Sequence, residues 1–187
     1  GAGAAGTAIT KILRQAGARI ILVGDRQGVI YRGRKGLRYE KQWIAAHTNP
    51  RRERSDLAGA LRGAAVFVGV SGPNLVTEAM AREMANDSIN FALANPIPEI
   101  MPGLAKRAGA VIIATGRSDF PNQLNNAQVF PGVFRGALDH RVRTITDVMK
   151  LKAARAIASL IPHPTPTRIV PNLFDKRLVR AVANVIR

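Results

Sequence analysis

The sequence contains no cysteine, which excludes disulfide frameworks, thiolate metal sites and cysteine nucleophiles. Its three histidines never fall at ligand spacing, so a histidine-based zinc site is not expected. No apolar run approaches the roughly 18 residues that a membrane span needs. No charged-then-apolar signal sequence opens the chain. Together these absences predict a cytoplasmic protein without a membrane partner.

Acidic residues are also scarce, since 12 aspartates and glutamates face 28 lysines and arginines, for a formal net charge of +16. This balance attracts polyanions and anionic cofactors but says little about fold. A basic nucleic-acid-binding module is therefore one interpretation. Aromatic residues make up only 5%, and no recognition motif is present, so specific nucleic-acid binding is not expected. The length of 187 residues, 47% of them hydrophobic, suits one domain with a real core.

A glycine-rich motif of the form G-x-G-x-x-G opens the chain, followed by a helical apolar pattern and a strand predicted over Arg19–Gly24. Glycines at this spacing allow a tight turn, close approach of the backbone to a pyrophosphate and close packing of helix on strand. The alternative interpretation is a flexible Gly-Ala terminus. The helix, the strand and the acid after it favour a dinucleotide site, with cofactor-binding residues Gly1, Ala2, Gly3, Ala4, Ala5, Gly6, Asp25 and Arg26.

The two residues after the predicted strand disagree about the coenzyme. Asp25 can accept hydrogen bonds from the adenosine ribose and would repel a 2′-phosphate, which favours NAD. Arg26 beside it can bind that phosphate, which favours NADP, or is simply a solvated loop arginine. NAD and NADP therefore both remain open.

The rest of the chain alternates strands with helices, which predicts an α/β fold of Rossmann-like type with a doubly wound parallel sheet. Strands are expected over Ala65–Val70, Ile89–Ala94 and Ala110–Thr115, with helices between them and a long helix over Ile145–Ile161. The strand that normally precedes a G-x-G-x-x-G is missing from this sequence, so a fragment is expected. The predicted domains are 1–161, which binds NAD(P), and 162–187, a proline-rich linker and helix packing on the same domain.

Polar loops follow three of the predicted strands, at the sheet edge where open α/β folds bind ligands. Ser71 and Asn95 are candidates there, and Asn95 is expected to be partly buried because the apolar residues Phe91–Ala94 precede it. The amide cluster 122–126 contains Asn125 and Asn126, which either cap a helix or contact a ligand. No carboxylate pair, Ser-His-Asp order or tyrosine with a base stands out, so no catalytic residue is predicted in this chain.

At these residues the sequence resembles the nucleotide-binding domain of malic enzymes, most closely those of the compact bacterial type. The resemblance covers essentially the whole chain and is most specific in its later segments. The matching segments are Gly1–Gly6, Val68–Ser71, Phe91–Ile100, Thr115–Asn126 and Phe130–Asp139.

The resemblance implies oxidative decarboxylation of malate to pyruvate and CO₂, with reduction of NAD or NADP. It implies that Asn95, Asn125 and Asn126 reach the nicotinamide and malate. It places the catalytic Tyr and Lys, and the ligands of Mg²⁺ or Mn²⁺, in an N-terminal half missing from this chain. The chain alone is therefore expected to be inactive. Its expected partners are that missing half and further copies of the enzyme in a homo-oligomer. A non-catalytic structural fragment is the alternative.

Four residues depart from the family pattern. Ala65 stands where an acid is usual, Gln128 replaces an aliphatic residue beside the substrate amides, and Lys152 replaces a small residue beside the helix stripe. A fourth departure is Ser88, which stands where proline is usual. Gln128 and Lys152 either weaken core packing or require polar partners.

Overall fold

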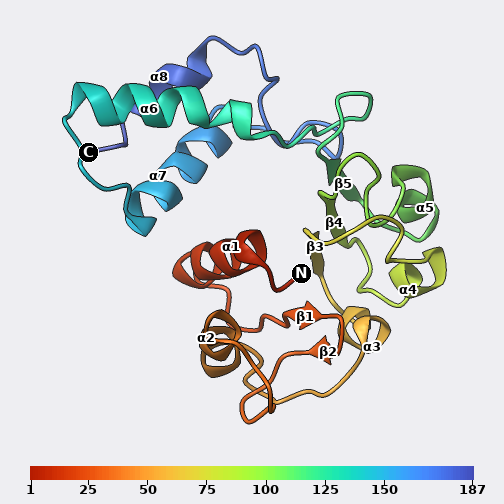
Figure 1. The fold of residues 1–187 in the computed structure, drawn as a ribbon. Helices are drawn as coiled ribbons and strands as arrows, with labels where there is room; N and C mark the ends of the chain where they lie inside the picture. Colours follow the sequence, from red (N-terminus) through yellow and green to blue (C-terminus); the bar gives the residue numbers. More distant parts are fainter. The chain divides into compact units, whose positions relative to one another are not determined.

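The computed structural model describes all 187 residues, and the chain folds into two compact units, Gly1–Ile113 and Ala114–Arg187 (Figure 1). Unit 1 contains α1 (Ala4–Gln15), β1 (Gly24–Asp25), β2 (Gly28–Val29), α2 (Tyr39–His47), α3 (Leu57–Leu61), β3 (Val66–Gly69), α4 (Glu78–Arg82), β4 (Ile89–Ala92) and α5 (Pro102–Arg107). Unit 2 contains η1 (Asn126–Gln128), a 3₁₀ turn, and α6 (Phe130–Asp139), α7 (Asp147–Ala158) and α8 (Arg177–Ala183). Strand β5 (Ile112–Thr115) crosses the boundary between the units.

A three-stranded sheet in the order β3-β4-β5 organises the middle of the chain. Strands β3 and β4 are parallel, with Val66 opposite Ile89 and Gly69 opposite Ala92. Helix α4 connects β3 to β4, and α5 connects β4 to β5. The apolar core joins residues from α3, α4, α5 and β4, including Leu61, Ala81, Ala92 and Ala105. Consecutive parallel strands linked by helices are the arrangement that the predicted α/β fold requires.

The strand predicted over Arg19–Gly24 is wrong in extent, because only β1 is regular and it pairs antiparallel with β2 in a short hairpin. The residues before β1 are extended, but their carbonyl groups accept from loop amides. Ile21 O accepts from Asn49 N at 2.9 Å, and Val23 O accepts from Ile30 N at 2.8 Å. No strand of the β3-β4-β5 sheet pairs with this segment.

The helices of unit 1 begin and end where capping chemistry allows. Gly17, just past the end of α1, has a φ of +104°, the left-handed conformation that a glycine at a helix C-terminus provides. Helix α4 begins at Glu78 because Thr77 caps it by accepting from Met80 N at 3.2 Å. In unit 2, the helix predicted over Ile145–Ile161 is α7, which begins two residues later than predicted, after the Thr146 cap, and ends at Ala158.

Unit 2 is a small helical assembly in which α8 packs against both α6 and α7. Two glycines of α6 permit the close approach, because a Cβ on Gly132 would lie 2.9 Å from Val179 O. A Cβ on Gly136 would lie 2.6 Å from Ala183 O. The core of this unit comprises Ala153, Val182 and Ile186, and Ala153 belongs to the predicted α7 stripe. The domain boundary predicted at residue 161 stays a prediction.

None of the helices combines the length and hydropathy that a membrane span requires. The cytoplasmic location stays a prediction.

Candidate functional site

The glycine loop is held tightly at its first and last glycines and is open in the middle. A Cβ on Gly6 would collide with the carbonyl oxygen of Gly1, and a Cβ on Gly1 would collide with Ser71 Oγ and approach Val70 O to 2.8 Å. Gly3 has no atom within 4 Å of its Cβ position. Gly1 and Gly6 are therefore needed by the loop itself, whereas the space beside Gly3 is open to a ligand.

The N-terminus of α1 leaves its first-turn amides available. Its N-cap is Gly3, no side chain caps it, and Thr7 N donates to Gly3 O at 2.9 Å at the start of the helix. Ala4 and Ala5 are exposed. The amides of a helix's first turn lack partners within the helix and, together with the helix dipole, favour an anion. The geometry of this loop suits a phosphate group.

Unit 1 brings the loop close to the residues that the sequence predicted around it. Ala2 packs on the apolar cluster that contains Val23, two residues before Asp25. Gly1 lies against Val70 and Ser71, at the carboxyl end of β3. The predicted cofactor residues Gly1–Gly6, Asp25 and Ser71 thus belong to one region of unit 1, at the ligand-binding edge of its sheet.

The carboxylate of Asp25 already forms ion pairs with two cationic side chains. Arg34 Nη2 donates to Asp25 Oδ1 at 2.7 Å, and Lys41 Nζ donates to Oδ2 at 2.5 Å. Gln27 N also donates to Oδ1, at 2.9 Å. Burial on its own raises the pKa of Asp25, and the hydrogen bonds from Lys41 and Arg34 outweigh it and lower the pKa to about 2. Arg34 and Lys41 are residues that the sequence analysis missed, since they lie nine and 16 positions away.

A buried glutamate, Glu99, joins the loops that follow β3 and β4. It is 1% exposed, and its two carboxylate oxygens accept from Ser71 N at 2.7 Å and from Ala94 N at 3.0 Å. A Cβ on Gly69 would collide with its carboxyl group, so a glycine is required there. Sequence reasoning missed this residue, although an acid between Pro98 and Ile100 in an apolar stretch could have signalled a buried partner.

Asn95 is exposed, so the expectation that it is partly buried is wrong. Its Nδ2 donates to Leu93 O at 3.5 Å, and the peptide bond between Asn95 and Pro96 is cis. The chain turns outward after β4 ends at Ala92, which carries Asn95 to the surface rather than continuing the buried strand. Its side chain is thereby accessible to a ligand.

In unit 2, most of the amide cluster has structural partners. Asn125 caps η1 by accepting from Ala127 N at 2.9 Å, as the capping alternative predicted. Gln128 is buried, accepts from Asn125 N at 3.0 Å and donates to Pro171 O at 2.9 Å. Asn122 is buried as well and holds the 166–169 segment. Asn126 is exposed, and only its backbone carbonyl is engaged, accepting from Val129 N at 3.0 Å, which leaves its side-chain amide available for a ligand.

The chain has no group of three or more His, Asp or Glu side chains that could hold a metal ion.

Comparison with known proteins decides the family. The family model described as malic enzyme, NAD binding domain, matches residues 1–186. The chain belongs to this family. It is 48% identical to the bifunctional malic/malolactic enzyme of Bacillus subtilis, 47% to the NAD-dependent malic enzyme of Geobacillus stearothermophilus and 42% to the NADP-dependent malic enzyme of Halomonas elongata. All three matches cover 100% of this chain.

A solved structure agrees with the sequence relatives. The NAD-dependent malic enzyme of Thermotoga maritima has a TM-score of 0.92 and 42% identity, covering 97% of this chain and 48% of that one. The chain also spans only 46%, 39% and 48% of the three relatives. The predicted family and Rossmann-like fold are confirmed, and the chain is a malic enzyme NAD-binding domain. The roles assigned to individual site residues stay predictions.

Proposed function

We propose that residues 1–187 are the coenzyme-binding part of a longer enzyme that oxidises malate and releases CO₂ to give pyruvate. We call this longer protein the whole enzyme. The observation that carries this proposal is the uncapped N-terminus of α1 beside the open space at Gly3, in a chain of the malic enzyme family. The names of its relatives, malic enzymes of both NAD and NADP dependence, support the same reaction.

The chain's residues bind and orient the coenzyme in this proposal. The first-turn amides of α1 donate to the pyrophosphate, which approaches the backbone closely because Gly3 has no side chain. Glu99 fixes the loops at Ser71 and Ala94, so that the ligand meets a preorganised edge. A bound nicotinamide would accept a hydride from the alcohol carbon of malate.

The charge around Asp25 supports acceptance of both coenzymes. One carboxylate faces two cations, Arg34 and Lys41, and the neighbouring Arg26 is exposed. A 2′-phosphate approaching this group therefore meets a net positive surrounding rather than an isolated negative charge. The carboxylate still has unused acceptor positions for a ribose hydroxyl, because three donors occupy it and a carboxylate offers about four sites.

On the substrate side, we assign Asn95 and Asn126 to ligand contact because both amides are exposed. Asn125 contributes mainly by capping η1 and so presenting Asn126. No step is assigned to a metal held by this chain. The catalytic tyrosine and lysine, the metal ligands and the homo-oligomer of the whole enzyme stay predictions.

The test is a titration of NAD and NADP into the whole enzyme and its Gly3→Val variant by isothermal calorimetry. The backbone of Gly3 (φ −85°, ψ −169°) is extended and its Cβ position is empty, so valine is compatible with the fold. We expect at least a tenfold loss of affinity for both coenzymes, a smaller loss in Gly3→Ala, and an unchanged melting temperature in both. Wild-type affinity in Gly3→Val would rule out this loop as the pyrophosphate site.

A further inference from the structure

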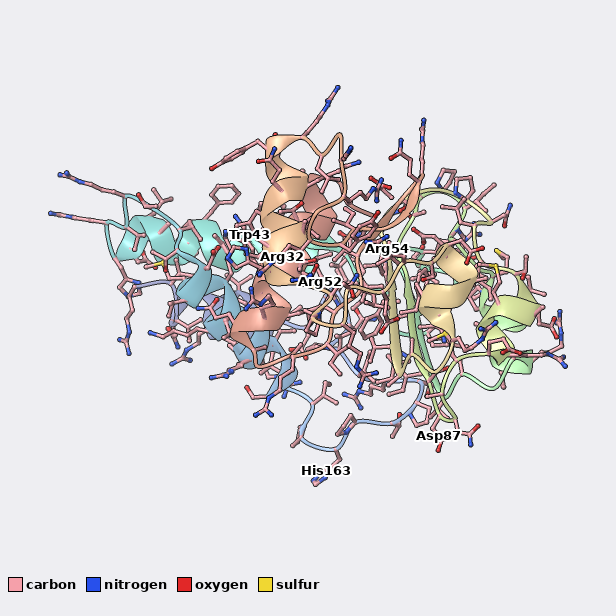
Figure 2. The ribbon with its side chains drawn as sticks, turned by 90° about the horizontal axis from the view of Figure 1, so that it is seen from below. Arg32, Trp43, Arg52, Arg54, Asp87 and His163 are labelled. Atoms are coloured by element: carbon pink, nitrogen blue, oxygen red, sulfur yellow. The ribbon has the colours of Figure 1, made fainter.

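A second concave site lies in unit 1 at the C-terminal ends of α1 and α2. It is a pocket of about 680 Å³ whose wall includes four arginines and no carboxylate: Arg14, Arg19, Arg32 and Arg52. Figure 2 shows Arg32 and Arg52 on the same part of the unit as Trp43. The volume lies within the range of about 300–1,000 Å³ typical of small-molecule sites.

The arginines of this pocket lack the acidic partners found elsewhere in the chain. Arg14, Arg19 and Arg52 form no ion pair or side-chain hydrogen bond, whereas other arginines pair with Asp25, Glu78, Asp119, Asp139 and Asp175. Arg32 donates to Ala46 O at 2.9 Å, which holds its guanidinium at the end of α2. Unpaired arginines are common on so basic a surface; here they converge on one concavity.

The wall that carries Arg52 is rigid. Asn49 is 2% exposed, donates to Ile30 O at 3.2 Å and Glu53 O at 2.9 Å, and accepts from Glu53 N at 2.8 Å. Both Asn49 (φ 51°) and Arg52 (φ 54°) adopt the left-handed region, which costs free energy for residues with side chains. The buried amide therefore holds a strained turn in place, and that turn presents Arg52 at the pocket.

We propose that this pocket binds a small molecule carrying several phosphate charges. Guanidinium groups recognise phosphate through paired N–H donors, and four of them require more than one negative charge for balance. The C-terminal ends of two helices add partial negative charge that opposes any anion, so the four guanidinium groups must outweigh it for a phosphate to bind. His47, also on the wall, donates its Nδ1 hydrogen to Trp43 O at 2.8 Å, so its other ring nitrogen is free to face the ligand.

The pocket is separate from the coenzyme loop. Arg14 lies in the last turn of α1, and the glycine loop lies at its first turn. A helix of 12 residues is about 18 Å long at about 1.5 Å per residue. The inference does not depend on the proposed malate reaction, because it rests only on the charge and shape of this end of unit 1.

The experiment uses inorganic tripolyphosphate, titrated into the whole enzyme by isothermal calorimetry at about 0.15 M salt, where long-range attraction is screened. We compare Arg52→Gln with Arg51→Gln, which removes the same charge from an adjacent exposed residue outside the pocket wall. We expect saturable binding that weakens at least tenfold in Arg52→Gln and less than twofold in Arg51→Gln. If Arg52→Gln folds poorly, Arg14→Gln takes its place, because Arg14 lies in the regular helix α1. That variant should weaken tripolyphosphate binding to a similar extent.

Three outcomes would overturn the proposal. Equal losses in Arg51→Gln and the pocket variants would show non-specific attraction to the basic surface. Loss of tripolyphosphate binding in Gly3→Val would place the anion at the coenzyme loop. Citrate binding as tightly as tripolyphosphate would show a site that selects charge and not phosphate.

Discussion

Replacing Glu99 by glutamine tests whether a buried carboxylate holds the two ligand loops together. The change preserves size but leaves only one oxygen where two backbone amides now donate, Ser71 N at 2.7 Å and Ala94 N at 3.0 Å. The new NH₂ group faces an N–H donor and cannot accept from it. One charge-assisted hydrogen bond is lost, and the other becomes a bond to a neutral acceptor.

The magnitude follows from the burial of Glu99 and the partial exposure of its partners. A hydrogen bond to a charged group contributes about 1.5–3 kcal/mol, and an orphaned buried donor costs about 1–3 kcal/mol. Because Ser71 is exposed and its amide can find water, we take the lower part of that range, about 2 kcal/mol in total. For a domain of 187 residues that unfolds as a unit, that loss lowers its melting temperature by about 4–8 °C, and by less if the whole enzyme unfolds in one step.

The assay is thermal unfolding of the whole enzyme, followed by near-ultraviolet circular dichroism, together with NAD titration. The matched control is Glu83→Gln, which removes the same charge from a side chain that is 60% exposed and 3.6 Å from Arg62. Surface changes of this kind shift stability by less than about 0.5 kcal/mol. Gly69→Ala should reproduce the Glu99→Gln effect, because its Cβ would displace the same carboxyl group. Equal melting temperatures and NAD affinities in Glu99→Gln and Glu83→Gln would refute the reasoning.

Two further predictions concern the polar groups that organise each unit. The folded pKa of Asp25, about 2, lies below its ordinary value, so the stability it confers is complete above about pH 5 and is lost as the pH falls through 4 toward 2. After allowance for solvent screening we expect about 1–2 kcal/mol, measured by urea unfolding of wild type and Asp25→Asn across that range. A difference between them that stays constant with pH would contradict this. In unit 2, Gln128→Leu should destabilise by about 1–3 kcal/mol, because Pro171 O and Asn125 N lose their partner. A more stable Gln128→Leu would show that leucine packing outweighs the lost bonds.

The alternation of apolar segments predicted the β3-β4-β5 sheet and most helices because each buries its own apolar side chains. The same logic failed at Arg19–Gly24, where apolar residues are extended but pair with Asn49 and Ile30 in loops. Periodicity also predicted a buried face on α1 that includes Ala5 and Leu13, yet both are exposed and the helix buries Gly6 and Thr10. Local pattern reports which residues are apolar; it does not report which neighbour covers them.

The partners of Asp25 and Glu99 lie beyond what spacing can reveal. Arg34 and Lys41 reach Asp25 only because the β1–β2 hairpin turns the chain back on itself. Glu99 reaches Ser71 because β3 and β4 are paired in register, so the ends of the two strands meet. Both carboxylates occur in the sequence as ordinary acids. Their roles arise from tertiary contacts between segments 9 to 28 residues apart.

The amide cluster shows how local hydrogen bonding narrows a functional prediction. Several amides in one loop suggested a ligand site, but amides also satisfy the backbone groups of turns. In unit 2, Asn122, Asn125 and Gln128 each bond backbone atoms, and those bonds account for why Gln128 stands at a position that is usually aliphatic. Removing Asn122 and Asn125 from the cluster leaves Asn126 as its exposed amide without such a role. Because Asn125 caps η1 at the residue before it, the cap fixes the backbone that carries Asn126, and a ligand contact there would inherit that rigidity.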